Sequence, residues 1–130
     1  MITLSCATPF ATVFDETQDI CVVGECEDGT EVLPTAIRTE PDVVLMGVSM
    51  PRMTGLEATR KLLTSRPDER IVMHSATATV DTACEAKDLG VAGYLVKGER
   101  SDDLPRMMRA VVTGRTVWSP VAARYLREYA

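Results

Sequence analysis

The chain has 130 residues, of which 45% are hydrophobic and 25% charged, and its formal net charge is −5 at pH 7. This length suffices to bury one hydrophobic core, so we expect a single domain. No run approaches the roughly 18 consecutive apolar residues of a membrane span, and the first residues lack the basic start of a secretory signal. We therefore expect a soluble, cytoplasmic protein without membrane contact, and the acidic balance argues against direct nucleic-acid binding by this chain.

Short apolar runs predict the strands of a parallel sheet. Residues 2–4 supply a weak first candidate, and residues 20–23 supply the next. Residues 43–46 and 71–73 are continuously apolar and are bounded by Pro, Asp or Arg, as expected for strands buried on both faces. Residues 93–96 have the same character, so we expect five strands.

Segments of helical periodicity lie between these strand candidates. The segment after the second strand contains Pro34, so its helix should begin late or kink. Residues 55–65 place leucines near one face and most charges elsewhere, which indicates an amphipathic helix. Two further helices have a capping residue at the start and a glycine at the end, namely Thr79 with Gly90 and Ser101 with Gly114.

Strands that alternate with helices at this spacing require right-handed crossovers. We therefore predict an α/β fold over residues 1–114, a doubly wound three-layer sandwich around a five-stranded parallel sheet. Residues 115–130 form a C-terminal helical tail, whose apolar residues, Trp118 among them, could dock on the domain or on a second copy. In such a fold, binding sites lie at the carboxyl ends of the strands.

The cysteines and the histidine predict no metal centre. Four cysteines are scattered without the short paired spacing of zinc or redox motifs: Cys6, Cys21, Cys26 and Cys84. We expect buried free thiols and no cofactor. His74 lies in an apolar run, where a satisfied core histidine is expected rather than a base or a ligand.

Four blocks of the sequence resemble the receiver domain of bacterial response regulators. In chain order they are DICVVGECEDGTEVL, PDVVLMGVSMPRMTGLEATRKL, RIVMHSATA and LGVAGYLVKG, and the resemblance covers residues 19–114. It implies the flavodoxin-like receiver fold. The segment around Trp118 is similar to the linker that precedes a helix-turn-helix output domain in the NarL/FixJ branch, and we expect that domain to be absent from this chain.

The chain departs from the family pattern at the positions that carry phosphorylation. The family has an aspartate shortly before a Met-Pro pair, and here Met50 and Pro51 are present while the acceptor position is Gly47. The acidic pair that helps to hold Mg²⁺ in the family is replaced by Cys6 and Ala7. Because Mg²⁺ requires oxygen ligands such as carboxylates, the resemblance implies neither a catalytic residue nor a metal site here.

Three other positions match the family. Ser75 corresponds to its hydroxyl residue, Tyr94 to its switching aromatic residue, and Lys97 to the lysine that pairs with the phosphorylated site. Without the carboxylate, we expect Lys97 to point at Ser75, at loop carbonyls or at a bound anion, or to reach water. A substitute acceptor such as Ser49 ranks last, because serine lacks a base nearby in the sequence.

The N-terminal alignment leaves two interpretations open. Either residues 2–4 are the first strand and a short first helix follows, or that strand is absent and residues 1–14 are helical. We favour the first, because a missing strand in the middle of a sheet would leave backbone groups unpaired.

The implied function is that of an atypical receiver domain, not an enzyme, which acts in two-component signal transduction or transcriptional regulation as a phosphorylation-independent protein-interaction module. The expected partners are a second copy of the chain, in a homodimer, and a sensor kinase or a transcription factor. The expected partner surface comprises the fourth helix, fifth strand and fifth helix, around Ala83, Lys87, Tyr94 and residues 106–109. The alternative is a small-ligand-sensing pseudo-receiver whose cleft takes a metabolite in place of the phosphoryl group.

Overall fold

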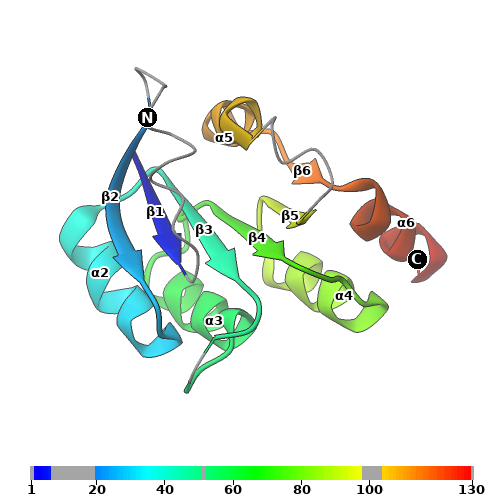
Figure 1. Ribbon diagram of the computed structural model, residues 1–130, viewed down its shortest axis with the longest axis horizontal. Coiled ribbons are helices and arrows are strands. Elements are labelled where there is room, and N and C mark those ends of the chain that lie inside the picture. Colours follow the sequence, from blue (N-terminus) through cyan, green and yellow to red (C-terminus); the bar gives the residue numbers. More distant parts are fainter. Residues whose placement is uncertain (1, 7–19, 51, 98–103, 130) are drawn as a thin grey trace.

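A parallel sheet forms the centre of the molecule in the computed structural model, which describes residues 2–6, 20–50, 52–97 and 104–129 (Figure 1). The strand order is β2-β1-β3-β4-β5-β6, and every pair of neighbouring strands is parallel. The strands are β1 (Ile2–Cys6), β2 (Cys21–Cys26), β3 (Val43–Gly47), β4 (Ile71–Ser75), β5 (Gly93–Val96) and β6 (Val117–Trp118). The predicted doubly wound α/β architecture is confirmed.

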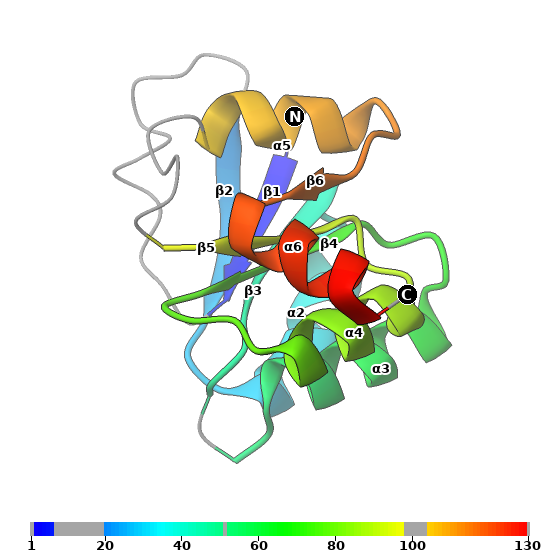
Figure 2. The same ribbon diagram turned by 90° about the vertical axis from the view of Figure 1, so that its right-hand side faces the viewer.

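Helices cover both faces of this sheet. They are the short 3₁₀ helix η1 (Gly29–Glu31), α2 (Val32–Thr39), α3 (Gly55–Ser65), α4 (Val80–Leu89), α5 (Leu104–Val112) and α6 (Pro120–Tyr129). Figure 2 shows α2, α3 and α4 on one face of the sheet and α5 on the other, which gives three layers. Within the described ranges, no helix combines the length and the apolar character needed to cross a bilayer.

The core lies on both sides of the sheet because successive side chains of a strand point to opposite faces. On β3, Val44 and Met46 belong to the apolar cluster that includes residues of α2, α3 and α4. Val43 and Leu45 belong to the cluster that includes residues of α5. All four side chains are fully buried, which explains why this segment of the sequence is continuously apolar.

The sheet has six strands, so the predicted count of five is wrong. The additional strand is β6, whose two residues pair with Gly93 and Tyr94 of β5. It lies in the segment that we predicted to be wholly helical, and only α6 is helical there. Two residues between Gly114 and Pro120 are too few to produce a recognisable strand pattern, which is why the sequence does not reveal β6.

Helix α6 packs against α4 and thereby changes which residues are accessible (Figure 2). Ala83 on α4 and Tyr94 on β5 are both completely buried. The prediction that these two residues belong to an exposed partner surface is therefore wrong, whereas Lys87 on the same helix is exposed.

The predicted helix boundaries follow from local capping chemistry. Thr79 Oγ1 accepts a hydrogen bond of 3.0 Å from the Thr82 amide and begins α4. Gly90 ends this helix in the left-handed region at φ 87°, which suits a residue without a Cβ. Pro34 lies in the first turn of α2, so the expected late start of that helix is confirmed. Ser101 lies outside the described residues.

The first strand is present. Strand β1 pairs with both β2 and β3, and this pairing confirms the strand and excludes a helix over residues 2–6. The short helix expected after it lies outside the described residues, as does Ala7.

Candidate functional site

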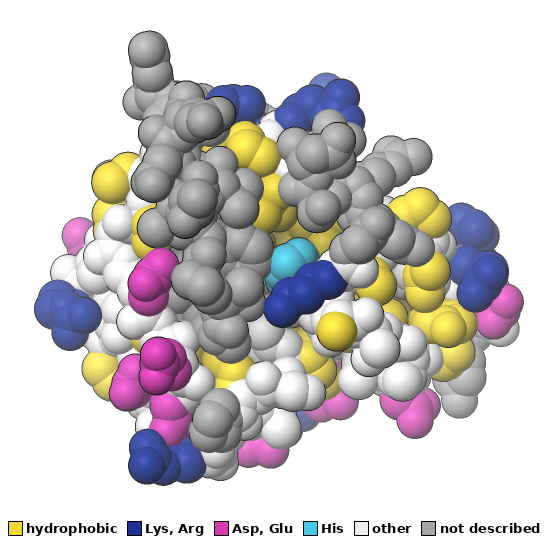
Figure 3. Space-filling view, in the orientation of Figure 1, with side chains coloured by type: hydrophobic (Ala, Val, Ile, Leu, Met, Phe, Trp, Pro, Cys, Tyr) yellow, Lys and Arg dark blue, Asp and Glu magenta, His cyan; other side chains and the backbone are white. Residues whose placement is uncertain are grey.

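A cleft of about 200 Å³ lies where β3, β4 and β5 end. This strand-end cleft is lined by Gly47, Val48, Ser49, His74, Ser75, Ala76, Thr77 and Lys97. The register of the sheet places these residues together, because Gly47 pairs with His74, and Ser75 pairs with Val96 just before Lys97. Figure 3 shows the single histidine of the chain, in cyan, beside a basic side chain. Three of the predicted site positions therefore meet in one cleft, at the edge where α/β proteins bind ligands.

Gly47 is buried at the end of β3, where the connection to α3 begins. The Gly55 amide donates a hydrogen bond of 2.8 Å to the Val48 carbonyl. A Cβ at Gly55 would lie 1.8 Å from the Gly47 carbonyl oxygen, so the turn closes only because residue 55 has no side chain. Residue 47 itself offers the cleft no nucleophile.

Tyr94 does not line the cleft but fixes the loop beside it. Its side chain is completely buried, and its hydroxyl donates to the Thr77 carbonyl at 3.1 Å and lies 3.2 Å from Thr82 Oγ1. From the other side, Ser75 Oγ accepts a hydrogen bond of 3.4 Å from the Thr77 amide. The sequence gives no signal for Thr77, because both of these contacts use its backbone.

We expect Tyr94→Phe to lower the free energy of unfolding by about 1 kcal/mol, the usual net contribution of a hydrogen bond that a buried hydroxyl makes. Urea denaturation of both proteins measures the difference. Tyr125→Phe on the half-buried face of α6 is the matched control and should leave stability nearly unchanged. Equal stability of Tyr94→Phe and the unaltered protein would contradict the role assigned to this hydroxyl.

Lys97 and His74 determine the electrostatics of the strand-end cleft. Lys97 is exposed, and it forms no ion pair with any carboxylate in the described part of the chain. Its backbone amide donates to the Ser75 carbonyl at 2.7 Å. His74 is only 7% exposed. Burial, and then the nearby Lys97 ammonium, lower the pKa of His74 to about 4, so the imidazole is neutral at pH 7.

The described residues of this cleft do not fit Mg²⁺. No carboxylate is among the eight lining residues, and Lys97 would repel a cation. In the described ranges, no group of three or more His, Cys, Asp or Glu side chains is arranged to hold a metal ion. Cys6 ends β1 with a side chain that the structure does not describe. Because Mg²⁺ binds through carboxylates and water, no step of a mechanism here can be assigned to it.

An ion pair beside the β3–α3 turn is not predicted by any pattern in the sequence. Arg52 Nη1 lies 2.6 Å from Asp28 Oδ2, and Arg52 adopts the unusual backbone angle φ 64°. The Thr30 amide donates to the same carboxylate and, together with Arg52, holds the pKa of Asp28 below its ordinary value. The contact joins the start of η1 to the turn after β3. The two residues are 24 positions apart in the sequence, so no local sequence pattern predicts their contact.

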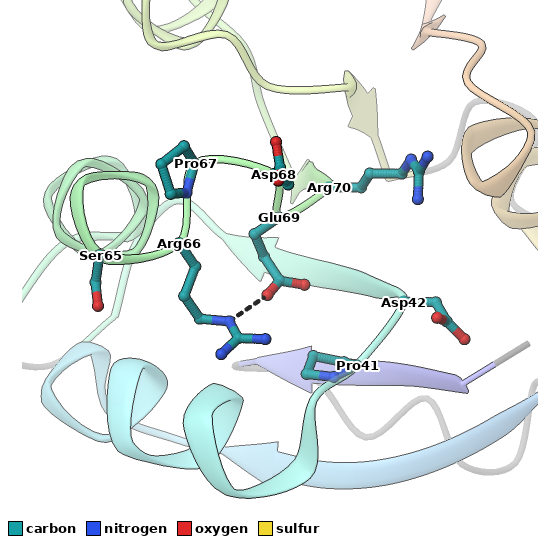
Figure 4. A pocket seen from close by; sticks show the side chains of 8 residues that line it. All are labelled: Pro41, Asp42, Ser65, Arg66, Pro67, Asp68, Glu69 and Arg70. Atoms are coloured by element: carbon teal, nitrogen blue, oxygen red, sulfur yellow. Dashed lines mark hydrogen bonds and ion pairs between the residues drawn. The ribbon is translucent and has the colours of Figure 1, made fainter.

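A second cavity, of about 380 Å³, lies at the opposite edge of the sheet, where β3 and β4 begin (Figure 4). It is lined by Pro41, Asp42, Ser65, Arg66, Pro67, Asp68, Glu69 and Arg70. Arg66 Nε and Glu69 Oε2 form an ion pair of 3.0 Å, the dashed line in Figure 4. Burial raises the pKa of Glu69. Arg66 and Glu69 are thus already paired with each other, and we interpret this contact as a structural end to α3.

Comparisons of sequence agree with the geometry. The model of the response regulator receiver domain matches residues 7–109. The response regulator GacA of Pseudomonas aeruginosa is 35% identical over 119 residues, which cover 92% of this chain and 56% of GacA. The response regulator UvrY of Escherichia coli K12 is 34% identical over 103 residues, which cover 79% of this chain and 47% of UvrY. The chain thus spans about half the length of the curated relatives it matches.

Comparisons with solved structures agree with the sequence comparisons. A two-component response regulator of the LuxR family from Aurantimonas sp. SI85-9A1 superposes with a TM-score of 0.89 at 26% identity, over 98% of this chain and 95% of that one. The isolated REC domain of RcsB from Salmonella enterica serovar Typhimurium superposes with a TM-score of 0.82, over 95% of this chain and 96% of that one. At 19% identity, the second likeness concerns the fold alone.

Proposed function

Since this chain belongs to the response-regulator receiver family, we propose that it is an atypical receiver domain whose output in two-component signalling does not require phosphorylation of residue 47. One observation carries the proposal: β3 ends in Gly47, and no carboxylate is among the residues that line the strand-end cleft. Phosphoryl transfer needs a nucleophile and stabilisation of the charge on the transferred group, commonly by a divalent cation. The described residues of the cleft supply neither.

The hydroxyl groups of the cleft are poor substitutes for an acceptor aspartate. A serine such as Ser49 or Ser75 becomes nucleophilic only when a neighbouring base removes its proton. His74 is the one candidate base among the lining residues, and its pKa of about 4 makes it a weak proton acceptor at neutral pH. We therefore propose that the chain is not an enzyme and acts by binding.

The proposed partners are proteins. GacA and UvrY, which cover most of this chain, are response regulators, and such a domain would work with a sensor kinase, a transcription factor or a second copy of itself. Because α6 packs against α4, the exposed side of α5 with Arg106 and Arg109 is the more accessible part of the expected partner surface. Unchanged self-association and partner capture after charge reversal at both arginines would exclude this face.

Intact-mass analysis after incubation with a small-molecule phosphodonor and Mg²⁺ tests the proposed function. We expect no phosphoryl adduct on the unaltered chain. The matched comparison is Gly47→Asp, which restores a carboxylate at the end of β3. An adduct on this variant alone would mean that only the acceptor is missing, and no adduct on either would mean that the metal site is missing as well. An adduct on the unaltered chain would overturn the proposal.

A further inference from the structure

We propose that Cys6 and Cys26 form a reversible disulfide when the protein reacts with a hydroperoxide, so that the ends of β1 and β2 carry a modification site. The inference goes beyond the proposed function, because it concerns neither residue 47 nor the strand-end cleft. It rests on the register of the two strands, on the burial of Cys26 and on the positions of the other two cysteines.

The register of the sheet sets the two cysteines opposite each other. Residues 4–6 of β1 pair in order with residues 24–26 of β2, so Cys6 lies beside Cys26. Neighbouring strands are about 4.8 Å apart, and the Cα atoms of disulfide-bonded cysteines are usually about 4.4–6.8 Å apart. The backbone spacing of paired strands is therefore within the range that a disulfide requires.

The two residues also lie on one face of the sheet. Residues in register on neighbouring strands share a face, and Cys6 is in register with both Cys26 and Met46. Cys26 and Met46 belong to the same apolar cluster, and Cys26 is only 3% exposed. A disulfide carries no charge, whereas the sulfinic acid that an isolated thiol forms with excess peroxide would place a charge in this apolar environment. The environment therefore favours the disulfide.

The other two cysteines lie too far away to compete. Cys21 begins β2, five positions before Cys26, and a strand extends by about 3.3 Å per residue, so about 16 Å separate the two. Cys84 lies on α4, which packs against α3, α6 and β5, and the sheet order places β3 and β4 between β1 and β5. Cys6 and Cys26 are therefore the pair of cysteines that one chain can join.

The reaction consumes two thiols and one hydroperoxide. The thiolate of one cysteine attacks the O–O bond, which gives a sulfenic acid and releases water or an alcohol. The second thiol then attacks the sulfenic sulfur, so that the S–S bond forms and a water molecule leaves. The two thiols lose two electrons and two protons in total, and the peroxide oxygens take up both.

The spacing of the strands makes this bond easy to reduce. The Cβ atoms of an unstrained disulfide are about 3.8 Å apart, which is less than the strand spacing of about 4.8 Å. The strands must therefore draw together, and a strained disulfide is reduced more readily. Both cysteines end their strands, so the shift affects the end of the sheet and the start of η1, which Asp28 caps two positions after Cys26.

Treatment of the reduced protein with hydrogen peroxide, followed by alkylation of the remaining thiols and intact-mass analysis, tests the inference. A glutamate-specific protease then separates the first three cysteines of the chain, because Glu16 and Glu25 lie between them. We expect the loss of two hydrogens and of two alkylation sites, with a crosslink between the peptides that contain Cys6 and Cys26. Dithiothreitol should restore both thiols.

Cys26→Ala and Cys6→Ala should each abolish the crosslink. Cys21→Ala changes a cysteine of the same strand and should keep it, and this variant also removes an exposed thiol that could join two chains. Absence of the crosslink, whether the two thiols stay reduced or become sulfinic acids, would overturn the inference. So would an unchanged loss of two hydrogens in Cys26→Ala. These outcomes are independent of the phosphodonor experiment, which contains no oxidant.

Discussion

Replacing Gly55 with alanine is expected to lower the free energy of unfolding by about 3 kcal/mol or more, at the upper end of the cost of overpacking a close contact. The new Cβ would lie 1.8 Å from the Gly47 carbonyl oxygen and 3.1 Å from the Val48 Cα. Both of these atoms belong to the backbone, so no side chain can rotate away to make room. The turn between β3 and α3 must therefore move, and the strand-end cleft beside it must change shape. Urea denaturation followed by circular dichroism measures the loss.

Gly90→Ala is the matched comparison for this substitution. Gly90 has φ 87°, and no atom lies within 4 Å of the place its Cβ would occupy. This variant should therefore lower the free energy of unfolding only by the cost of placing an alanine in the left-handed backbone region, about 1–2 kcal/mol. If Gly55→Ala costs no more than Gly90→Ala, the β3–α3 turn is softer than the contact implies.

Acid should destabilise the protein through its one histidine, with a loss of about 2 kcal/mol between neutral pH and the folded-state pKa. In the unfolded chain His74 has its ordinary pKa of 6.5, and in the folded protein burial and Lys97 lower it to about 4. Between these values only the unfolded chain binds the proton. Stability therefore falls as the pH drops from 6.5 towards 4, and this group contributes no further loss below that range. The expected loss is smaller than the full shift implies because the cleft is partly open to water.

His74→Leu isolates this contribution. The difference in unfolding free energy between the variant and the unaltered protein, measured at several pH values from 7.5 to 4, should change by about 2 kcal/mol in favour of the variant. Subtraction removes the carboxylates, including Glu69, whose pKa is raised by burial and whose effect has the opposite sign. A difference that stays constant with pH would show that the folded protein protonates His74 as easily as the unfolded chain does.

Much of the fold can be predicted from the sequence because the signals are local. A run such as residues 43–46 is apolar at every position only when both faces of the strand are covered. Thr79 and Gly90 mark the ends of α4 because a side-chain cap and a left-handed residue act within one helical turn. The first strand was the weakest candidate, and it lies in the middle of the sheet between β2 and β3.

Contacts between distant segments could not be predicted in this way. The ion pair of Asp28 with Arg52 depends on how two loops meet in the folded protein. The approach of Gly55 to Gly47 depends on how the connection between β3 and α3 folds back on itself. The formation of strand β6 depends on its pairing with the backbone edge of β5 rather than on a pattern in its own two residues.

The candidate site likewise has one part that the sequence predicts and another that only the folded structure reveals. Family resemblance indicated Gly47, Ser75 and Lys97, and parallel strands bring their ends to one edge of the sheet, so the three residues meet. The resemblance did not reveal that His74 lines the same cleft, since the sequence favoured a core position. It also did not reveal that burial, and then Lys97, lower the pKa of His74. Those properties arise from the register of β4 beside β3, from the burial of His74 and from its nearness to Lys97.

The pairing of β6 with β5 also bears on aggregation. An unpaired strand edge presents a row of free N–H and C=O groups to which another chain can add. Here β6 occupies that edge beside the apolar residues of β5, and the other edge of the sheet is β2. Glu25 on β2 is exposed, and a charged residue at an edge discourages a second chain from adding there. The two edges of the sheet are thus protected in different ways, one by a short strand of the same chain and the other by charge.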